Sequence, residues 1–168
     1  SSEIENIVTT QDELFQADLF PEGPGSAAAK EVALYRDALR LGFDQLRKTQ
    51  GLITNRIIID MFRLLKGRDD GFRTQAGTEL KNDRTGETVY VPPQGPREIE
   101  TLMAGLEVFI NDDDACDLDP LIKMAIIHHQ FESIHPFPDG NGRIGRILNV
   151  LYLTRTGLLD IPILYLSR

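Results

Sequence analysis

The feature that most constrains this chain is the stretch HPFPDGNGRIGR at residues 135–146, which separates two apolar patterns of helical spacing. Upstream, residues 121–131 are mostly apolar, and downstream the apolar pattern resumes from Ile144. The proline, glycine, aspartate and asparagine residues between them favour a turn. We therefore predict a helix that ends near Ile134, a tight turn, and a second helix that begins near Asn141.

Residues 140–143 would present their backbone N–H groups at the N-terminus of this second helix. Unpaired N–H donors and the positive end of the helix dipole together favour a bound anion. Arg143 and Arg146 are three residues apart, so they share one helix face above the turn. Two guanidinium groups that keep their charge suit a polyphosphate. The stretch therefore predicts a phosphate-binding site.

Two further residues of this turn could supply chemistry. Asp139 lies beside the phosphate-binding donors, and a magnesium ion that bridges its carboxylate to phosphate oxygens would resolve the conflict of charge. His135 titrates near neutral pH, which makes it the candidate general base. We expect Phe137 to anchor the turn in the core. Taken singly, these residues have ordinary alternatives, namely a surface turn, a solvated helix face and a histidine cap, but their fixed spacing favours a functional site.

The stretch resembles the signature of the Fic family, H-P-F-x-[DE]-G-N-G-R-x-x-R, and fills every specified position. The resemblance extends to residues 128–131, to residues 159–167, and to VPP at residues 91–93, which is similar to the end of the family's flap hairpin. Residues 1–6, SSEIEN, resemble the inhibitory motif [ST]-x-x-x-E-[GN] of one Fic class. The chain is therefore identified as a member of the Fic family, in the class whose inhibitory helix precedes the core.

The resemblance implies a nucleotidyltransferase: a protein adenylyltransferase that moves AMP from ATP to a Tyr, Thr or Ser hydroxyl of a target protein. His135 would be the catalytic base that takes the hydroxyl proton, and Asp139 would hold Mg²⁺. The implied nucleotide-binding residues are Asp139, Gly140, Asn141, Gly142, Arg143, Ile144, Gly145 and Arg146. Some relatives transfer other phosphate-containing groups or remove AMP. The intact Gly142 favours nucleotidyl transfer over phosphorylation.

The resemblance also implies autoinhibition, with Ser1, Glu5 and Asn6 as regulatory residues. Glu5 would pair with Arg146 and thereby leave ATP in an unreactive pose, so Glu5 is included among the nucleotide-site residues. A carboxylate–arginine pair shielded from water is strong enough to compete with a phosphate contact. The alternative is that Ser1 or Ser2 caps a short helix and that Glu3 or Glu5 complements its dipole.

A β-hairpin is predicted from residues 79–82 and 87–91, which flank the turn sequence DRTG at residues 83–86. In the Fic family this flap pairs with an extended segment of the target protein by β-augmentation. The residues that we expect nearest the nucleotide and target are Gly77, Thr78, Glu79 and Leu80. The alternative is a surface hairpin without a role.

The whole chain is predicted to be mainly α: a Fic-type helical bundle with one β-hairpin flap over the active site. Its 168 residues, 41% of them apolar, suit a single core. The expected organisation is an inhibitory helix segment at 1–20, a linker at 21–25 and the Fic catalytic core at 26–168, as a fragment of a longer protein. Helical patterns run over residues 27–48, 54–65, 96–110, 120–134 and 141–156.

The composition limits the partners and the cellular compartment that we expect. The net charge of −8 argues against nucleic-acid binding, and no apolar run reaches membrane-spanning length. The single cysteine fits a reducing compartment, so we expect a cytoplasmic protein; a homo-oligomer is left open. Two alternatives remain: a zinc or iron site formed by His128, Glu132 and His135, and a nucleotide-binding interaction module that Glu5 holds inactive.

Overall fold

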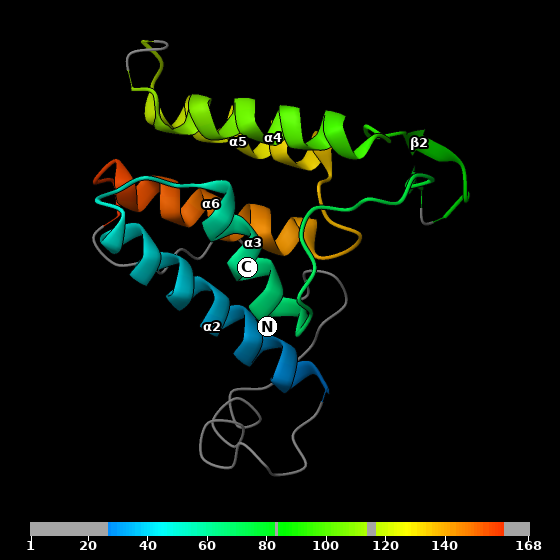
Figure 1. Cartoon of the computed structure of the whole chain (residues 1–168), viewed down its shortest axis with the longest axis horizontal. Coiled ribbons are helices and arrows are strands. Elements are labelled where there is room, and N and C mark those ends of the chain that lie inside the picture. Colours follow the sequence, from blue (N-terminus) through cyan, green and yellow to red (C-terminus); the bar gives the residue numbers. More distant parts are fainter. Residues whose placement is uncertain (1–26, 83, 114–116, 160–168) are drawn as a thin grey trace.

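The computed structural model describes residues 27–82, 84–113 and 117–159. Their elements follow the order of Figure 1. The helices are α2 (Ala27–Lys48), α3 (Asn55–Lys66), α4 (Pro96–Asn111), α5 (Pro120–Ile134) and α6 (Asn141–Arg155), and the strands are β1 (Leu80–Lys81) and β2 (Thr88–Tyr90). The predicted helical ranges are confirmed to within one residue at each end. None of the described helices combines the length and apolarity needed to cross a membrane.

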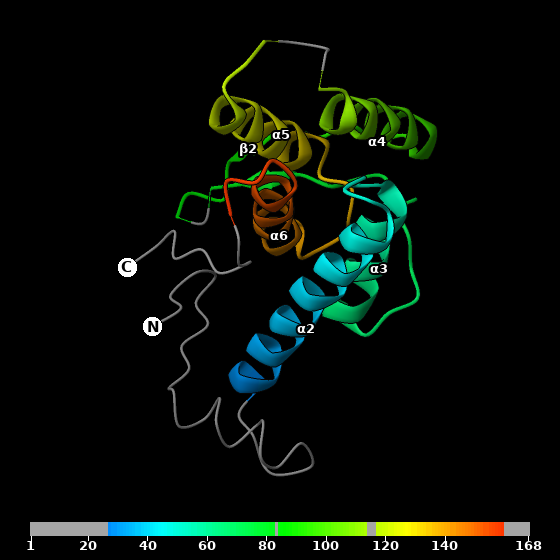
Figure 2. The same ribbon diagram turned by 90° about the vertical axis from the view of Figure 1, so that its left-hand side faces the viewer.

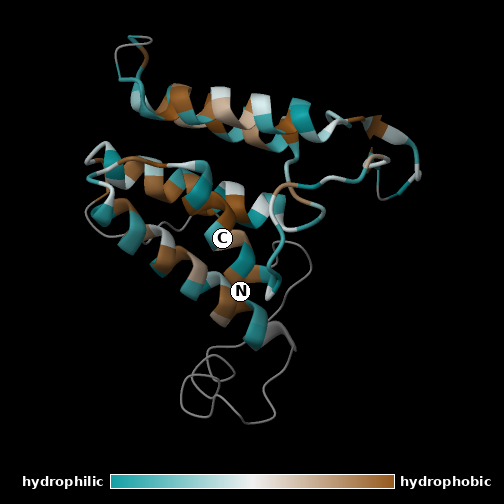
Figure 3. Ribbon diagram, in the orientation of Figure 1, coloured by the Kyte–Doolittle hydropathy of each residue, from teal (hydrophilic) through white to brown (hydrophobic). Residues whose placement is uncertain are grey.

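Helix α6 forms the centre of the bundle and contacts α2, α3 and α5. Figures 1 and 2 show α4 and α5 side by side in one layer, with α6 beneath α5 and with α2 and α3 on its other side. Most of α6 is buried, including Ile144, Ile147, Leu148 and Leu151, each with an exposed fraction of 0%. Figure 3 shows apolar and polar residues alternating along the helices, as expected for helices with one side in a core.

Close packing around α6 depends on a glycine in α2. A Cβ atom at Gly42 would lie 2.4 Å from Sδ of Met61 in α3 and 2.9 Å from Cδ1 of Leu151 in α6. Only a residue without a side chain therefore lets α2 approach both neighbours at this point. Separately, Lys66 at the end of α3 contacts Asp139 in the turn just before α6, and the candidate site lies in this region.

Capping residues fix the ends of the helices that border this region. Thr54 accepts a hydrogen bond from the N–H of Ile57 at the start of α3, and Gly67 ends that helix with a φ of 61°. At the start of α5, the side chain of Asp119 accepts from the N–H of Leu121, and Pro120 occupies the first turn. In α3 and α5 the sequence thus supplies a capping side chain directly before the first residue of the helix.

The hairpin is shorter than predicted. Strands β1 and β2 are antiparallel, with Leu80 opposite Tyr90 and Lys81 opposite Thr88, and the register is irregular between the two pairs. The side chain of Asn82 accepts hydrogen bonds from the N–H groups of the turn that follows it. The hairpin lies beyond the N-terminal end of α4 (Figure 1). The fold class, mainly α with one hairpin, is confirmed.

Candidate active site

The turn between α5 and α6 is built around Asn141 and Phe137. The side-chain Oδ1 of Asn141 accepts from the N–H of Phe137 at 2.9 Å, and its Nδ2 donates to the carbonyl of Phe137 at 2.8 Å. The Phe137 ring stacks on Phe62 of α3 at a centroid distance of 4.0 Å. Phe137 thus occupies the core as predicted. Because the side chain of Asn141 is buried and closes the turn, the phosphate contact predicted for this residue would have to come from its backbone N–H.

Helix α6 begins in a manner suited to an anion. Gly140 precedes it with a φ of 79°, and among the described residues no side chain caps the helix. The first N–H groups of α6 are therefore available as donors at the positive end of the helix dipole. The left-handed backbone of Gly140 favours glycine at this position, because a residue with a side chain would be strained there.

His135 lies where α5 ends, with a left-handed backbone (φ 49°, ψ 58°) that is uncommon for a residue with a side chain. Its N–H donates to the carbonyl of Phe131 at 3.0 Å. The Nδ1 atom is buried and has no hydrogen bond of good geometry among the described residues. The backbone carbonyl of Glu132 nevertheless acts to raise the pKa of the ring.

Burial lowers the pKa of His135 below that of an ordinary histidine. The carbonyl of Glu132 and the charge of Asp139 oppose this shift, whereas the cation of Arg73 adds to it. The ring is therefore neutral at neutral pH, which is the form that a general base requires.

Asp139 lies between two cations. Its Oδ2 accepts from Nζ of Lys66, at the end of α3, and its Oδ1 is 3.7 Å from a terminal nitrogen of Arg143. Lys66 holds the pKa of the Asp139 carboxyl below its usual range. The carboxylate is thus ionised, and 64% of its side chain is exposed.

A magnesium ion of the kind that the sequence predicts fits this carboxylate. Mg²⁺ is usually held by one or two protein carboxylates together with substrate phosphates and water. Asp139 offers one accessible carboxylate beside the anion-binding end of α6. The described residues hold no group of three metal-ligating side chains, which gives the zinc or iron alternative no support.

The two motif arginines differ in their surroundings. The side chain of Arg143 is 9% exposed and pairs with Glu31 of α2, whereas Arg146 is half-buried. Glu31 and Lys66 were not predicted from the sequence, because each meets the motif from a distant helix. The predicted regulatory residues Ser1, Glu5 and Asn6 lie outside the described residues.

Ile144 and Gly145, both predicted to bind nucleotide, face the interior. The Ile144 side chain has an exposed fraction of 0%. A Cβ atom at Gly145 would lie 2.6 Å from Oε1 of Glu132 and 3.1 Å from Cε1 of His128, so this glycine lets α6 approach α5. These two residues therefore serve packing, and only their backbone could contribute to a nucleotide site.

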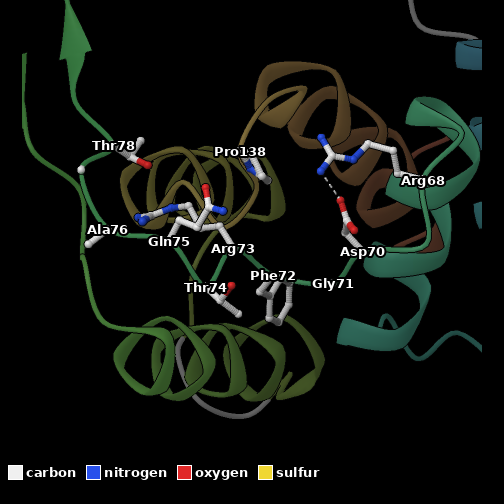
Figure 4. A pocket seen from close by; sticks show the side chains of 11 residues that line it. Arg68, Asp70, Gly71, Phe72, Arg73, Thr74, Gln75, Ala76, Thr78 and Pro138 are labelled. Carbon is white, nitrogen blue, oxygen red and sulfur yellow. Dashed lines mark ion pairs between the residues drawn. The ribbon is translucent and has the colours of Figure 1, made fainter.

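A cavity of about 520 Å³ lies between the segment that leads into the flap and Pro138 of the motif turn. Figure 4 shows the segment from Arg68 to Thr78 curving past Pro138. Gly77 and Thr78 line this cavity, whereas the other two predicted flap residues, Glu79 and Leu80, are not among its lining residues. Besides Pro138, its other lining residues are Arg68, Asp70, Gly71, Phe72, Arg73, Thr74, Gln75 and Ala76.

The sequence matches of this chain agree with the geometry. The Fic/DOC family matches residues 45–153, and the Fic/DOC family N-terminal region matches residues 1–44. Since the first match covers more than half of its residues, the chain belongs to the Fic/DOC family. The predicted family is thereby confirmed.

Two named relatives match part of this chain in sequence. It is 33% identical over 105 residues to a protein adenylyltransferase Fic of Drosophila virilis, a match that covers 62% of this chain and 21% of the relative. The Drosophila melanogaster protein of the same name is 32% identical over 105 residues, which cover 62% of this chain and 20% of the relative. The matched region thus spans about a fifth of the length of these relatives.

Solved structures show the same fold. A Fic domain containing signaling protein from Bacteroides thetaiotaomicron is 25% identical, with a TM-score of 0.73 over 91% of this chain and 59% of that protein chain. A glutamate-to-glycine variant of Fic-1 from C. elegans is 28% identical, with a TM-score of 0.63 over 84% of this chain and 42% of the other.

Proposed function

We propose that this chain carries the active site of a protein adenylyltransferase, which transfers AMP from ATP to the hydroxyl of a Tyr, Thr or Ser side chain. The observation that carries the proposal is that one turn, closed by Asn141, holds a neutral His135 ring on one side and the uncapped start of α6 on the other. The name of the Drosophila relatives, protein adenylyltransferase, supports the same reaction.

The phosphates of ATP would bind at the start of α6. Its N–H groups and the guanidinium groups of Arg143 and Arg146 supply donors and positive charge at fixed places. Such preorganised charge is the main source of catalysis in phosphoryl-type transfer. Asp139 would hold Mg²⁺, which when bound supplies charge neutralisation on the phosphate oxygens.

His135 would accept the proton of the target hydroxyl. The hydroxyl oxygen then forms a bond to the α-phosphorus, the bond from the α-phosphorus to the bridging oxygen breaks, and pyrophosphate leaves with the electron pair. A well-placed general base contributes a factor of roughly 10²–10⁴ to such a reaction. The lowered pKa of His135 keeps the ring ready to accept that proton at neutral pH.

The flap would present the target. The side chains of Val89 and Val91 are 70% and 55% exposed, which leaves apolar surface for an extended segment that pairs with the hairpin. Gly77 and Thr78, which line the cavity beside Pro138, would lie nearest the reacting hydroxyl. Main-chain pairing of this kind reads little sequence, so the target is set largely by its shape and by other parts of the protein.

Glu5 would regulate the reaction. Its carboxylate, paired with Arg146, would withdraw a guanidinium from the terminal phosphate of ATP and so hold the nucleotide in an unreactive pose. This proposal rests on the match of residues 1–6 to the inhibitory motif. Replacing Glu5 by glycine is therefore expected to raise activity.

The test uses ATP labelled separately on the α- and γ-phosphates, incubated with Mg²⁺ and three proteins: wild type, Glu5→Gly, and Glu5→Gly/His135→Ala. Label retained on protein, either on the enzyme itself or on an added lysate, is followed by gel. Transfer of α-label by Glu5→Gly that His135→Ala abolishes is the expected result. Transfer of γ-label would contradict adenylyl transfer, and equal labelling by wild type and Glu5→Gly would contradict the inhibitory role of Glu5.

A further inference from the structure

Arg73 lies in the segment between α3 and the flap, and its buried side chain contacts the end of α5. Its side chain is 4% exposed. Nε donates to the carbonyl of His135 at 2.8 Å, and one terminal nitrogen lies 3.5 Å from the carbonyl of Ile134. Its own backbone N–H donates to the carbonyl of Pro136 at 2.8 Å. One residue thus binds three consecutive carbonyls around the candidate base.

The same guanidinium also binds the flap. The terminal nitrogen that approaches Ile134 donates to the carbonyl of Pro93, at the point where the chain returns from the hairpin to α4. Arg73 therefore ties the base of the flap directly to the turn that carries His135.

The physical setting favours this arrangement. The last carbonyls of a helix lack partners within the helix, and they lie at the negative end of its dipole, where a cation is stabilising. His135 has a left-handed backbone (φ 49°), which costs energy for a residue with a side chain and persists only when its surroundings hold it. The carbonyl of Phe131 holds the N–H of His135, and Arg73 holds its carbonyl.

Two other side chains bind the flap near its base. The side chain of Gln94 accepts from the N–H of Gly77 at 2.6 Å and donates to the carbonyls of Thr78 and Pro92, so it bridges both arms of the hairpin. The hydroxyl of Tyr90 in β2 donates to the carbonyl of Ser133 at 3.0 Å. Both arms of the hairpin are therefore linked by hydrogen bonds to the base of the flap, where Arg73 binds.

We propose that Arg73 is a positioning residue that couples the flap to His135 and so fixes where a hydroxyl held by the flap meets the imidazole. The link to transfer rests on the proposed function, whereas the coupling itself belongs to the protein without nucleotide. A lysine cannot replace the arginine fully, because a single ammonium on a flexible stem does not reproduce the planar fork of donors.

Arg73 also acts on His135 through its charge. It is one of the groups that lower the pKa of the imidazole, together with burial and against the opposing effect of Asp139. Removing the cation is therefore expected to raise the pKa of His135. Removing an arginine that only stabilises the fold elsewhere would not change the pKa of His135, so this shift distinguishes the two roles.

The experiment compares Arg73→Gln and Arg73→Lys with wild type, and uses Arg68→Gln as the matched control. Arg68 lines the same cavity, but it is exposed and paired with Asp70. Amide hydrogen exchange follows residues 80–90 against α3 and α6, and NMR titration follows the His135 ring, assigned by its loss in His135→Ala. Each measurement uses the protein without nucleotide.

For Arg73→Gln we expect exchange of the flap amides to rise by about tenfold or more while α3 and α6 keep their protection, and the pKa of His135 to rise. Arg73→Lys should loosen the flap but keep the pKa of His135 close to that of wild type, and Arg68→Gln should change neither. Unchanged flap exchange, or a uniform loss of protection across all helices, would overturn the proposal. If Arg73→Gln does not fold, Arg73→Lys decides the flap result.

These readings are independent of catalysis. If the variants loosen the flap and shift the His135 pKa while no labelled phosphate is ever transferred, the coupling stands and adenylyl transfer fails. If transfer occurs and the Arg73 variants leave the flap and the His135 pKa unchanged, the coupling fails and adenylyl transfer stands.

Discussion

The motif turn, residues 135–146, and the flap, residues 77–93, differ in what holds them. The turn is held by the core: Phe137 is fully buried and stacked on Phe62, and the buried amide of Asn141 closes the loop. The flap is held at its base by Arg73, Gln94 and a few hydrogen bonds. Every residue from Arg84 to Val91 is exposed.

The difference suits the two tasks that the proposed function assigns to these regions. Phosphoryl-type transfer needs a base and charges held at fixed places, because misplacement of even about 1 Å costs rate. A surface that receives an extended segment needs only an accessible strand edge and some freedom to adjust. The molecule thus places its rigid packing beneath the motif turn and leaves the edge of the hairpin open.

The largest expected effect comes from the anchor of the turn. Phe137→Ala should lower the free energy of unfolding by roughly 3–5 kcal/mol, because it empties a fully buried ring site. Val89→Ala on the flap, where the side chain is 70% exposed, is the control and should change stability by less than about 0.5 kcal/mol. Chemical denaturation measures the free energy of unfolding of both variants. Similar losses of stability would contradict the difference between the turn and the flap.

A smaller loss is expected from Gly145→Ala, because the new Cβ would lie 2.6 Å from Oε1 of Glu132 and crowd the ring of His128. Overpacking of this kind costs roughly 1–3 kcal/mol. Gly105 in α4 is the matched control, since a Cβ atom there meets no atom within 4 Å. Gly105→Ala should stabilise the protein by about 0.4–1 kcal/mol. Thermal unfolding distinguishes the two, and an unchanged stability of Gly145→Ala would show that the side chains of Glu132 and His128 can move aside.

A local effect is expected from Tyr90→Phe, which removes the hydrogen bond from β2 to the carbonyl of Ser133. A neutral hydrogen bond contributes about 0.5–1.5 kcal/mol, so the flap amides should exchange several-fold faster. The global unfolding midpoint should remain near that of wild type. A large shift of that midpoint would mean that the flap is part of the cooperative core.

The smallest expected effect concerns pH. Because the pKa of His135 is lowered by burial, the ring stays neutral as pH falls through the ordinary histidine value of about 6.5. The rate of transfer should therefore begin to fall only below that pH, when the ring becomes protonated and cannot accept a proton. The pH dependence of kcat/KM measures this limb. A fall that begins above about pH 6.5 would contradict the lowered pKa.

Local patterns predicted most of the fold. The apolar period located each helix, and the proline and glycine residues of the motif located the turn, because such signals act within a few residues. Phe137 was predicted as the anchor for the same reason. The strands were predicted too long, since a two-stranded hairpin with exposed faces has little packing to set its ends.

The long-range contacts of the site were not predictable from sequence patterns. Arg73 meets His135 across 62 residues, and Glu31 meets Arg143 across 112. Single charged residues in a loop or on a helix face carry no local sign of such partners. Asn141 shows a related difficulty: the motif marks the residue, but only the structure assigns its side chain to closing the turn.

The most direct test of the account separates binding from chemistry at His135. Transfer of α-labelled phosphate and the Kd for ATP with Mg²⁺ are measured for Glu5→Gly and for Glu5→Gly/His135→Ala. The account predicts that loss of the imidazole lowers transfer by a factor of roughly 10²–10⁴ and leaves the Kd nearly unchanged, because the proposed phosphate site is at the start of α6 and not at His135. Loss of ATP binding in parallel with transfer, or transfer that persists, would contradict the assignment of His135 as the base.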